Sequence, residues 1–268
     1  RTYPMRYEDD AMGLVKTASQ IVHIRKLAVT ISEILAESIG LVRPGLSTRE
    51  LDAAIEAIMA RRGVNGPCKG YEGFPAVSCI SVNEVVTHGK PDGRILALGD
   101  IVDIDLVIEK GGFFADVSKT VAVGRLEGTA LRLVTTAEEC LEAGLAAVRP
   151  GATLGDIGFA VQSHAEGAGF SVVREFCGHF IGTDMHEGPP VLNYGRPGTG
   201  LRLEPGMILC VEPMINEGRR AITVDPDGWN TRTRDGKLSS RCEHMVLVTE
   251  TGHEVLTRHP RELVVEAR

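Results

Sequence analysis

The sequence predicts an α+β fold built from two related halves, and a pattern that recurs along the chain carries this prediction. Residues 43–47, Arg-Pro-Gly-Leu-Ser, recur as Arg-Pro-Gly-Ala-Thr at residues 149–153, and further similar residues follow at the same shift. Residues 99–105 and 206–212 align at nearly the same offset. Each segment starts with a glycine, and the mainly apolar run that follows is typical of a β-strand. A fixed offset of similar residues indicates a duplicated unit. Because helices precede strands in each copy, we expect two helix-and-strand halves.

Each copy begins with a helix, a turn and a second helix. Residues 29–41 and 135–148 are apolar at helical spacing, and a Pro-Gly pair follows each run. Ser47 and Thr153 can cap the second helices, which would extend to a glycine in each copy, Gly63 and Gly169. This helical pattern could match by chance, but the aligned strands argue against chance.

The halves would meet near residues 124–129, and each is too small for a closed core of its own. We therefore expect an N-terminal segment, 1–20, and one domain, 21–268, with halves at about 21–125 and 126–250. Residues 1–10 contain neither an apolar run nor a small-residue cleavage site, so no signal peptide is expected there.

Composition limits the classes of function. The chain has 268 residues, 43% of them hydrophobic, and a formal charge of −7 without a basic run. A disordered chain, a nucleic-acid-binding surface and a membrane-bound protein are therefore not expected. Six cysteines without a Cys-x-x-Cys pair suit buried, reduced thiols and a cytoplasmic location.

Two carboxylates are placed by a predicted hairpin. A turn at residues 110–112 would join two strands and set Asp105 opposite or diagonal to Asp116. Like charges at such a distance are destabilising unless a cation lies between them. A turn shifted by one residue would instead send one carboxylate to solvent.

Further candidate ligands follow along the chain. His179 and His186 are seven residues apart, so both can face one cavity only if the backbone turns between them, as Gly182 permits. Glu212 occupies the register of Asp105 in the second copy, and Glu243 begins an apolar strand at 239–250. An acid at the start of a strand is more often exposed. Four carboxylates and one imidazole nevertheless suit two divalent ions, such as Mn, Fe, Co or Zn.

These motifs resemble the type I methionine aminopeptidases over residues 21–249. The resemblance rests on His88 in Asn-Glu-Val-Val-Thr-His, the two aspartates, the two histidines, Glu212 before proline, and Glu243 between cysteine and histidine. It implies a pita-bread fold, with a curved antiparallel sheet around two metal ions (Co, Mn, Fe, Ni or Zn). The implied metal ligands are Asp105, Asp116, His179, Glu212 and Glu243.

The resemblance also implies an activity, the removal of N-terminal methionine from nascent proteins when the next residue is small. We assign catalytic roles to His88, His186 and Glu212, with Glu212 moving a proton from water to the leaving amine. A methionine pocket is implied at Cys68, Tyr71, Phe74, Cys79, Met185 and Trp229. A sodium or potassium ion is implied at Asn83, Val85 and Ser239.

Two residues depart from the family pattern. Met185 stands where an aromatic residue is more frequent, and Phe180 stands where glycine is common. The first could loosen the pocket, and the second could alter the rim of the metal site.

Other interpretations stay open at this point. Prolidase or aminopeptidase P would share the fold but carry a domain ahead of the catalytic one, and only 87 residues precede His88. A catalytically silent pita-bread protein could instead bind the ribosome or RNA, although it would be expected to lose ligands and gain basic surface. We expect a monomer that binds N-terminal peptides, without direct contact to nucleic acid or membrane. Ribosome association would suit such an enzyme, but no motif shows it.

Overall fold

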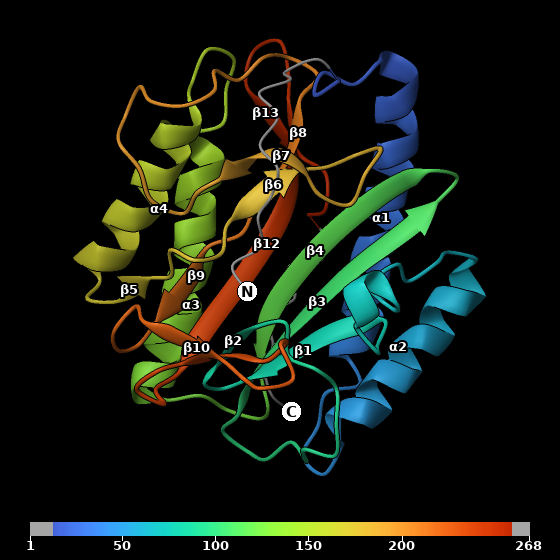
Figure 1. The fold of residues 1–268 in the computed structure, drawn as a ribbon, viewed down its shortest axis with the longest axis vertical. Coiled ribbons are helices and arrows are strands. Elements are labelled where there is room, and N and C mark those ends of the chain that lie inside the picture. The colour runs from blue at the N-terminus through green and yellow to red at the C-terminus, as the bar shows by residue number, and fades with distance from the viewer. Residues whose placement is uncertain (1–12, 259–268) are drawn as a thin grey trace.

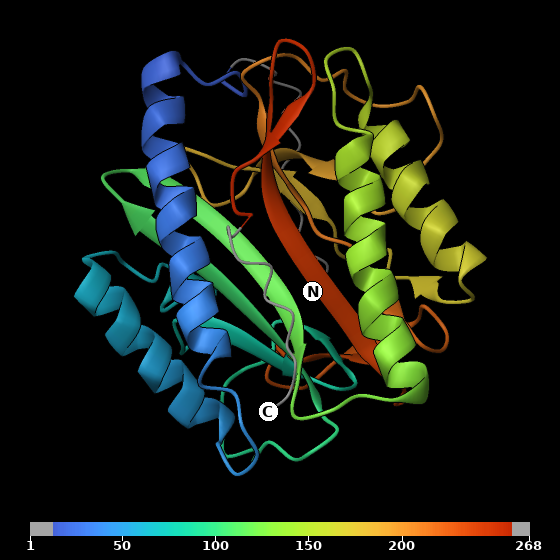
Figure 2. The same cartoon turned by 180° about the vertical axis from the view of Figure 1, so that it is seen from behind.

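Two helix pairs cover one face of a curved antiparallel sheet (Figure 1). The computed structural model describes residues 13–258. Seen from behind, α1 and α3 lie across the back of the sheet, with α2 and α4 at its flanks (Figure 2). The predicted α+β pita-bread class is confirmed. The helices are α1 (Ala18–Ile39), α2 (Thr48–Arg62), α3 (Gly128–Ala146) and α4 (Leu154–Gly167).

The main sheet has a symmetric order. Its strands run β1-β3-β4-β12-β8-β6-β7, with β4 and β12 adjacent at the centre. The two halves therefore meet along one strand pair, as a duplicated chain predicts. The bounds are β1 (Ser78–Val82), β3 (Ile101–Lys110), β4 (Phe113–Ala122), β6 (Gly178–Phe180), β7 (Glu187–Val191), β8 (Ile208–Val211) and β12 (Ser239–Val248).

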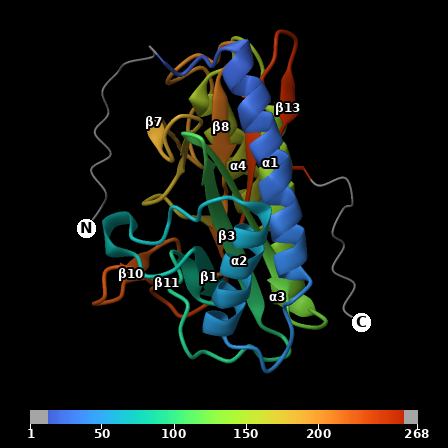
Figure 3. The same ribbon diagram turned by 90° about the vertical axis from the view of Figure 1, so that its right-hand side faces the viewer.

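Shorter strands complete the fold. β5 (Ser171–Val172), β9 (Met214–Asn216) and β13 (His253–Val255) extend the main sheet. A second, three-stranded sheet consists of β10 (Ile222–Val224), β11 (Thr231–Thr233) and β2 (Val85–Thr87). Helix α1 and strands β10 and β11 lie on opposite sides of the molecule (Figure 3). A 3-10 turn spans Tyr71–Gly73.

The second helix of each pair begins where the sequence predicts. Ser47 and Thr153 are the N-caps of α2 and α4, each in a capping box with an acid three residues later. Gly63 ends α2 in the left-handed conformation, whereas α4 ends at Gly167, two residues before the predicted Gly169.

The first helices are longer than predicted. α1 begins at Ala18 rather than at residue 29, because Thr17 and Gln20 form a capping box upstream of the strongly apolar stretch. α3 likewise begins at Gly128 rather than at residue 135. The missed turns also face the core, because Ile24 and Leu27 of α1 and Leu133 of α3 are buried.

Buried apolar side chains form two large clusters, one beneath each helix pair. The cluster beneath α1 and α2 also contains Ile208 and Met245 from the second half. The cluster beneath α3 and α4 includes Ile101 from the first half, and also Leu14. Each cluster thus contains side chains from both halves.

The β3–β4 hairpin fixes the first pair of acids. Gly111 and Gly112 form its turn with φ of 65° and 80°, a conformation that favours glycine and the two-residue hairpin turn. Val107 lies opposite Asp116, and Asp105 lies opposite Ser118. Asp105 and Asp116 are therefore diagonal neighbours on one face of the sheet, one of the two arrangements that the sequence predicts.

The start of the described chain packs onto the second half. Val15 forms a bridge with Met207, and the buried Lys16 pairs with Glu187. Residues 1–12 of the predicted N-terminal segment 1–20, which include the residues 1–10 considered for a signal peptide, lie outside the described residues. Among residues 13–258, no helix has the length and apolarity needed to cross a bilayer.

Candidate metal centre

The five predicted ligands lie on the inner face of the sheet. Asp105 and Asp116 belong to β3 and β4, His179 to β6, and Glu243 to β12, while Glu212 directly follows β8. All five are buried, with exposed fractions between 0% for Glu243 and 7% for Asp105. Four acids in so dry a site require positive charge close by.

His179 presents one ring nitrogen to the acids. Its Nδ1 lies 3.0 Å from the carbonyl oxygen of Phe180, which fixes Nδ1 as the protonated donor. Nε2 is then an unprotonated acceptor, 3.5 Å from Asp116 Oδ2 and 3.7 Å from Glu212 Oε1. Burial lowers the pKa of His179, so the ring is neutral at pH 7, the form that binds metals.

Close strand packing sets the position of this histidine. Gly178 precedes it, and a Cβ at Gly178 would lie 2.1 Å from the carbonyl oxygen of Cys210 in β8. Only glycine allows β6 and β8 to approach so closely. The sequence around His179 is therefore required for the placement of its ring.

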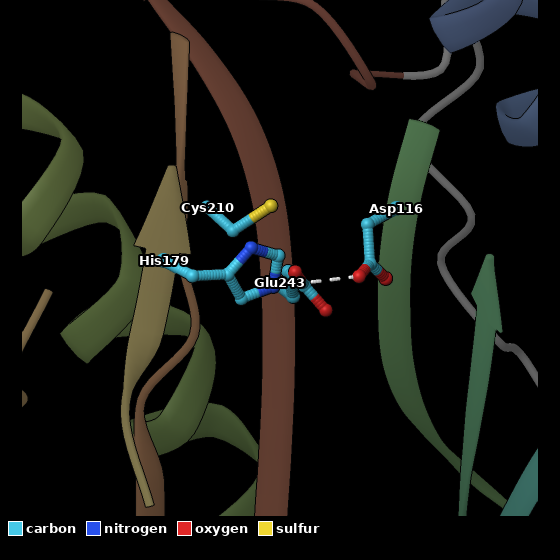
Figure 4. Close-up of side chains that lie close together, drawn as sticks. All are labelled: Asp116, His179, Cys210 and Glu243. Carbon is cyan, nitrogen blue, oxygen red and sulfur yellow. Dashed lines mark ion pairs between the residues drawn. The ribbon is translucent and has the colours of Figure 1, made fainter. Parts of the chain in front are cut away.

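Four side chains converge on one point (Figure 4). Asp116, His179, Cys210 and Glu243 each offer one ligand atom, and these atoms all lie within 4.8 Å of one another. Asp116 Oδ1 and Glu243 Oε1 are buried and accept no hydrogen bond within residues 13–258. Such orphaned acceptors beside an unprotonated imidazole fit a divalent cation.

Burial also shifts the acids and the thiol toward their neutral forms. It raises the pKa of Glu243 to about 8, and it raises that of Asp116, with the Asp105 charge adding to the effect. Burial and then the charge of Glu243 raise the pKa of the Cys210 thiol. Cys210 was not among the predicted ligands, although its position two residues before Glu212 is a signal in the sequence.

A buried arginine is the main feature that sequence reasoning missed. Arg241 Nη2 lies 2.9 Å from Glu212 Oε2 and 2.9 Å from Glu243 Oε2, and Nη1 pairs with Asp105 Oδ2. Although burial opposes the charge, the three acids outweigh it and the pKa of Arg241 is raised. Arg241 is two residues before Glu243, so alternation along β12 could have placed both on one face.

The two predicted catalytic histidines border the same cavity. The rings of His179 and His186 are 4.6 Å apart and nearly perpendicular. His88 packs edge-on against Phe176, with ring centroids 5.2 Å apart. Burial lowers the pKa of His88 to about 4 and that of His186 to about 3, so both rings are neutral near pH 7. The chain turns at Gly182, between His179 and His186, as the seven-residue spacing of these histidines required.

A cavity of about 550 Å³ opens over the acids. Phe74 and Trp229 meet edge to face within it, at a centroid distance of 4.9 Å. The sequence missed several further apolar lining residues, because β9, β10 and their loops approach the site only in the folded chain. The lining includes all six predicted pocket residues, Cys68, Tyr71, Phe74, Cys79, Met185 and Trp229, and the missed Val107, Phe176, Met214, Ile222 and Val224.

The two departures from the family pattern occupy different places. Met185 is 5% exposed and lines the cavity. Phe180 is fully buried in the cluster beneath α3 and α4, and only its carbonyl faces His179. Its side chain therefore packs in the core instead of at the metal rim.

The loop that carries Met185 and His186 is held by a buried ion pair. Lys16 Nζ lies 2.6 Å from Glu187 Oε2, with the lysine side chain 1% exposed. Glu187 Oε1 also accepts hydrogen bonds from the amides of Thr183 and Asp184. The Glu187 carboxylate thus stabilises the loop internally and also connects it to Lys16.

The residues of the predicted monovalent site are close in space. Asn83 has a positive φ of 56°, and its carbonyl oxygen accepts a hydrogen bond from the amide of Ser239 at 2.9 Å. Val85 is two residues further on, in β2. A cation bound there stays a prediction.

Comparison with known proteins assigns this architecture to a family. Residues 22–250 match the model of metallopeptidase family M24. Methionine aminopeptidase A of Synechocystis is 46% identical over 218 residues, which cover 81% of this chain and 86% of that protein.

Solved structures agree with the family match. The methionine aminopeptidase of Rickettsia prowazekii superposes with a TM-score of 0.89 at 38% identity, over 91% of this chain and 99% of the other. The prolidase of Pyrococcus furiosus shares the fold, with a TM-score of 0.75 at 22% identity over 92% of this chain and 66% of its own.

Proposed function

The chain belongs to metallopeptidase family M24 and, within it, to the methionine aminopeptidases, and from this premise we propose that it releases N-terminal methionine when a small residue follows. The observation that carries the proposal is the cavity itself. Its apolar and sulfur-bearing wall lies directly over a buried cluster of acids and one neutral imidazole. A methionine side chain fits such a wall, because thioethers pack well against aromatic rings and other sulfurs.

Family membership establishes the use of divalent metal, and the donors argue for where it binds. We propose that Asp116, His179 and Glu243 hold an ion, with Glu212 beside them. A divalent ion there would lower the pKa of a bound water toward neutrality and polarise the scissile carbonyl. Mixed oxygen and nitrogen donors suit Mn, Fe, Co, Ni or Zn. The two ions expected from the sequence would require Arg241 to release Asp105, Glu212 and Glu243.

Glu212 is the proposed proton carrier. Burial is the main cause that raises its pKa above the ordinary value. A carboxyl with a raised pKa can take a proton from the attacking water and return it to the departing amine near neutral pH. Its position on the cavity wall supports this role, because a peptide bound in the cavity would lie beside it.

His186 and His88 are the proposed hydrogen-bond donors to substrate. Each ring is neutral at pH 7 and keeps one N–H to donate. His186, beside His179, would stabilise the negative charge that develops on the scissile carbonyl oxygen. His88, which lies 6.4 Å from the Trp229 ring, would contact the leaving-group side.

The remaining expectations concern partners and location. Substrates are N-terminal peptides, and we propose that these are the ends of newly made proteins, met in the cytoplasm and near the ribosome. All six cysteines are free thiols, which suits a reducing compartment. We further propose a monomer, which light scattering at assay concentration would test.

A peptide assay tests the proposed activity. The protein is stripped with chelator, reloaded with Mn, Co, Fe or Zn, and given Met-Ala-Ser, Met-Leu-Ser and Lys-Ala-Ser. We expect metal-dependent release of methionine from Met-Ala-Ser, at least about 100-fold slower release from Met-Leu-Ser, and none from Lys-Ala-Ser. Equal release from all three, or release unaffected by chelator, would contradict the proposal.

A further inference from the structure

We propose that the Arg241 guanidinium is a built-in cation that takes the place of a second divalent ion, so that the centre binds one ion, between Asp116, His179 and Glu243. The inference rests on the metal centre of the proposed function and specifies its occupancy. It concerns residues that the structure brings together from β3, β8 and β12.

The guanidinium is held on three sides by acids. Nη2 lies 2.9 Å from one oxygen each of Glu212 and Glu243, and Nη1 pairs with Asp105. Nη1 is also 3.4 Å from the hydroxyl of Thr87. An arginine fork bound to several carboxylates is a strongly oriented arrangement, and the guanidinium stays protonated at any physiological pH.

The ligand atoms that are not paired with Arg241 suffice for one ion only. Asp116 Oδ1 and Glu243 Oε1 accept no hydrogen bond within residues 13–258, and His179 Nε2 faces them. Asp105 is absent from the group of ligand atoms that lie within 4.8 Å of one another, and its Oδ2 is paired with Arg241. A second ion beside Asp105 would have to displace the guanidinium.

Displacement would be costly because Arg241 has little else to pair with. Its side chain is 5% exposed, so a released guanidinium would not reach bulk water without rearrangement. Asp103, also on β3, is a further buried acid near it, but Arg241 makes no hydrogen bond with Asp103 in the described chain. An uncompensated buried charge is strongly unfavourable.

The test measures metal content and not turnover. Chelator-treated protein is dialysed against Mn²⁺, bound metal per chain is measured by atomic absorption, and electron paramagnetic resonance separates isolated Mn²⁺ from magnetically coupled pairs. We expect one isolated ion in the wild type, and two coupled ions in Arg241→Gln, with at least about tenfold tighter binding of the second ion than in the wild type. Arg241→Lys keeps the charge and should stay at one ion.

Two further variants distinguish a change in metal binding from a folding defect. Asp103→Asn with Arg241→Gln leaves the net charge of the cluster unchanged, and it should bind two ions even if the single variant is unstable. Arg25→Gln removes a half-exposed arginine paired with Glu254, so it serves as a matched control and should bind one ion.

The outcomes separate this inference from the proposed function. Two results would overturn the role of Arg241 while leaving the metal centre intact. One is two coupled ions in the wild type, and the other is a single ion both in Arg241→Gln and in Asp103→Asn with Arg241→Gln. A wild type that binds no metal would overturn the metal centre, and this inference with it.

Discussion

His179 Nε2 lies 3.5 Å from Oδ2 of Asp116, although the two side chains come from opposite halves of the duplicated chain. Both are buried, and burial lowers the pKa of the imidazole, so the ring is neutral at pH 7. Two ligand atoms that face each other without a strong hydrogen bond are separated as they would be around a shared ion. The chemistry of the cavity depends on this pairing across the halves.

Glu212→Gln should remove most of the activity. The amide keeps the shape of the side chain but cannot accept a proton, so we expect kcat for Met-Ala-Ser to fall by at least about 100-fold. Glu166→Gln, on the exposed face of α4, is the matched control and should stay within about threefold. A Glu212→Gln enzyme that works at a third of the normal rate or better would contradict the proton-carrier role.

The metal-free protein should lose stability as the pH rises from 6.5 to 8. In this window Glu243, whose pKa burial raises to about 8, is protonated in the folded state, whereas the same carboxyl is ionised in the unfolded chain. The folded state holds more protons, so the free energy of unfolding should fall by about 1.4 kcal/mol per pH unit for this one group at pH 6.5, and by about half of that per unit near pH 8. Urea unfolding in chelator at several pH values measures the slope.

Two controls accompany the pH series. Glu243→Gln should flatten the slope by about one proton, and saturating Mn²⁺ should cancel the Glu243 contribution, because the acids are then ionised in the folded protein as they are in the unfolded chain. His88 and His186, with pKa values of about 4 and about 3, act in the opposite direction only below the ordinary histidine pKa of about 6.5. Metal-free protein that gains stability between pH 6.5 and 8 would disprove the assignment.

Lys16→Met should weaken the hold on the loop before β7. The methionine preserves the apolar stem but leaves Glu187 without its cation, so we expect a loss of about 1–3 kcal/mol in the free energy of unfolding. KM for methionine peptides should also rise, because Met185 and His186 precede Glu187. Lys69→Met breaks an exposed pair with Glu56 and should change stability by less than about 1 kcal/mol. Equal effects of the two substitutions would show that the buried pair does not hold the loop.

Much of the site follows from local rules. The Gly111–Gly112 turn fixes the register of one hairpin, and that register alone makes Asp105 and Asp116 neighbours. The duplication then places Glu212 at the equivalent point of the second half. Because each step uses only the nearby sequence or a fixed offset, these relationships could be predicted before the structure.

The role of Arg241 could be predicted only in part. Its two-residue spacing from Glu243 puts both on one face of β12, but that spacing does not show which acids the guanidinium contacts. The contacts of Arg241 with Asp105 and Glu212 also depend on the order of strands in the sheet, which local patterns do not set.

The most direct measurement is an anomalous-scattering map from crystals grown with Mn²⁺. The account predicts a strong peak about 2.0–2.3 Å from a carboxylate oxygen of Asp116, from Nε2 of His179 and from a carboxylate oxygen of Glu243. A map with its only peaks elsewhere, or with no peak between these three side chains at saturating metal, would contradict it.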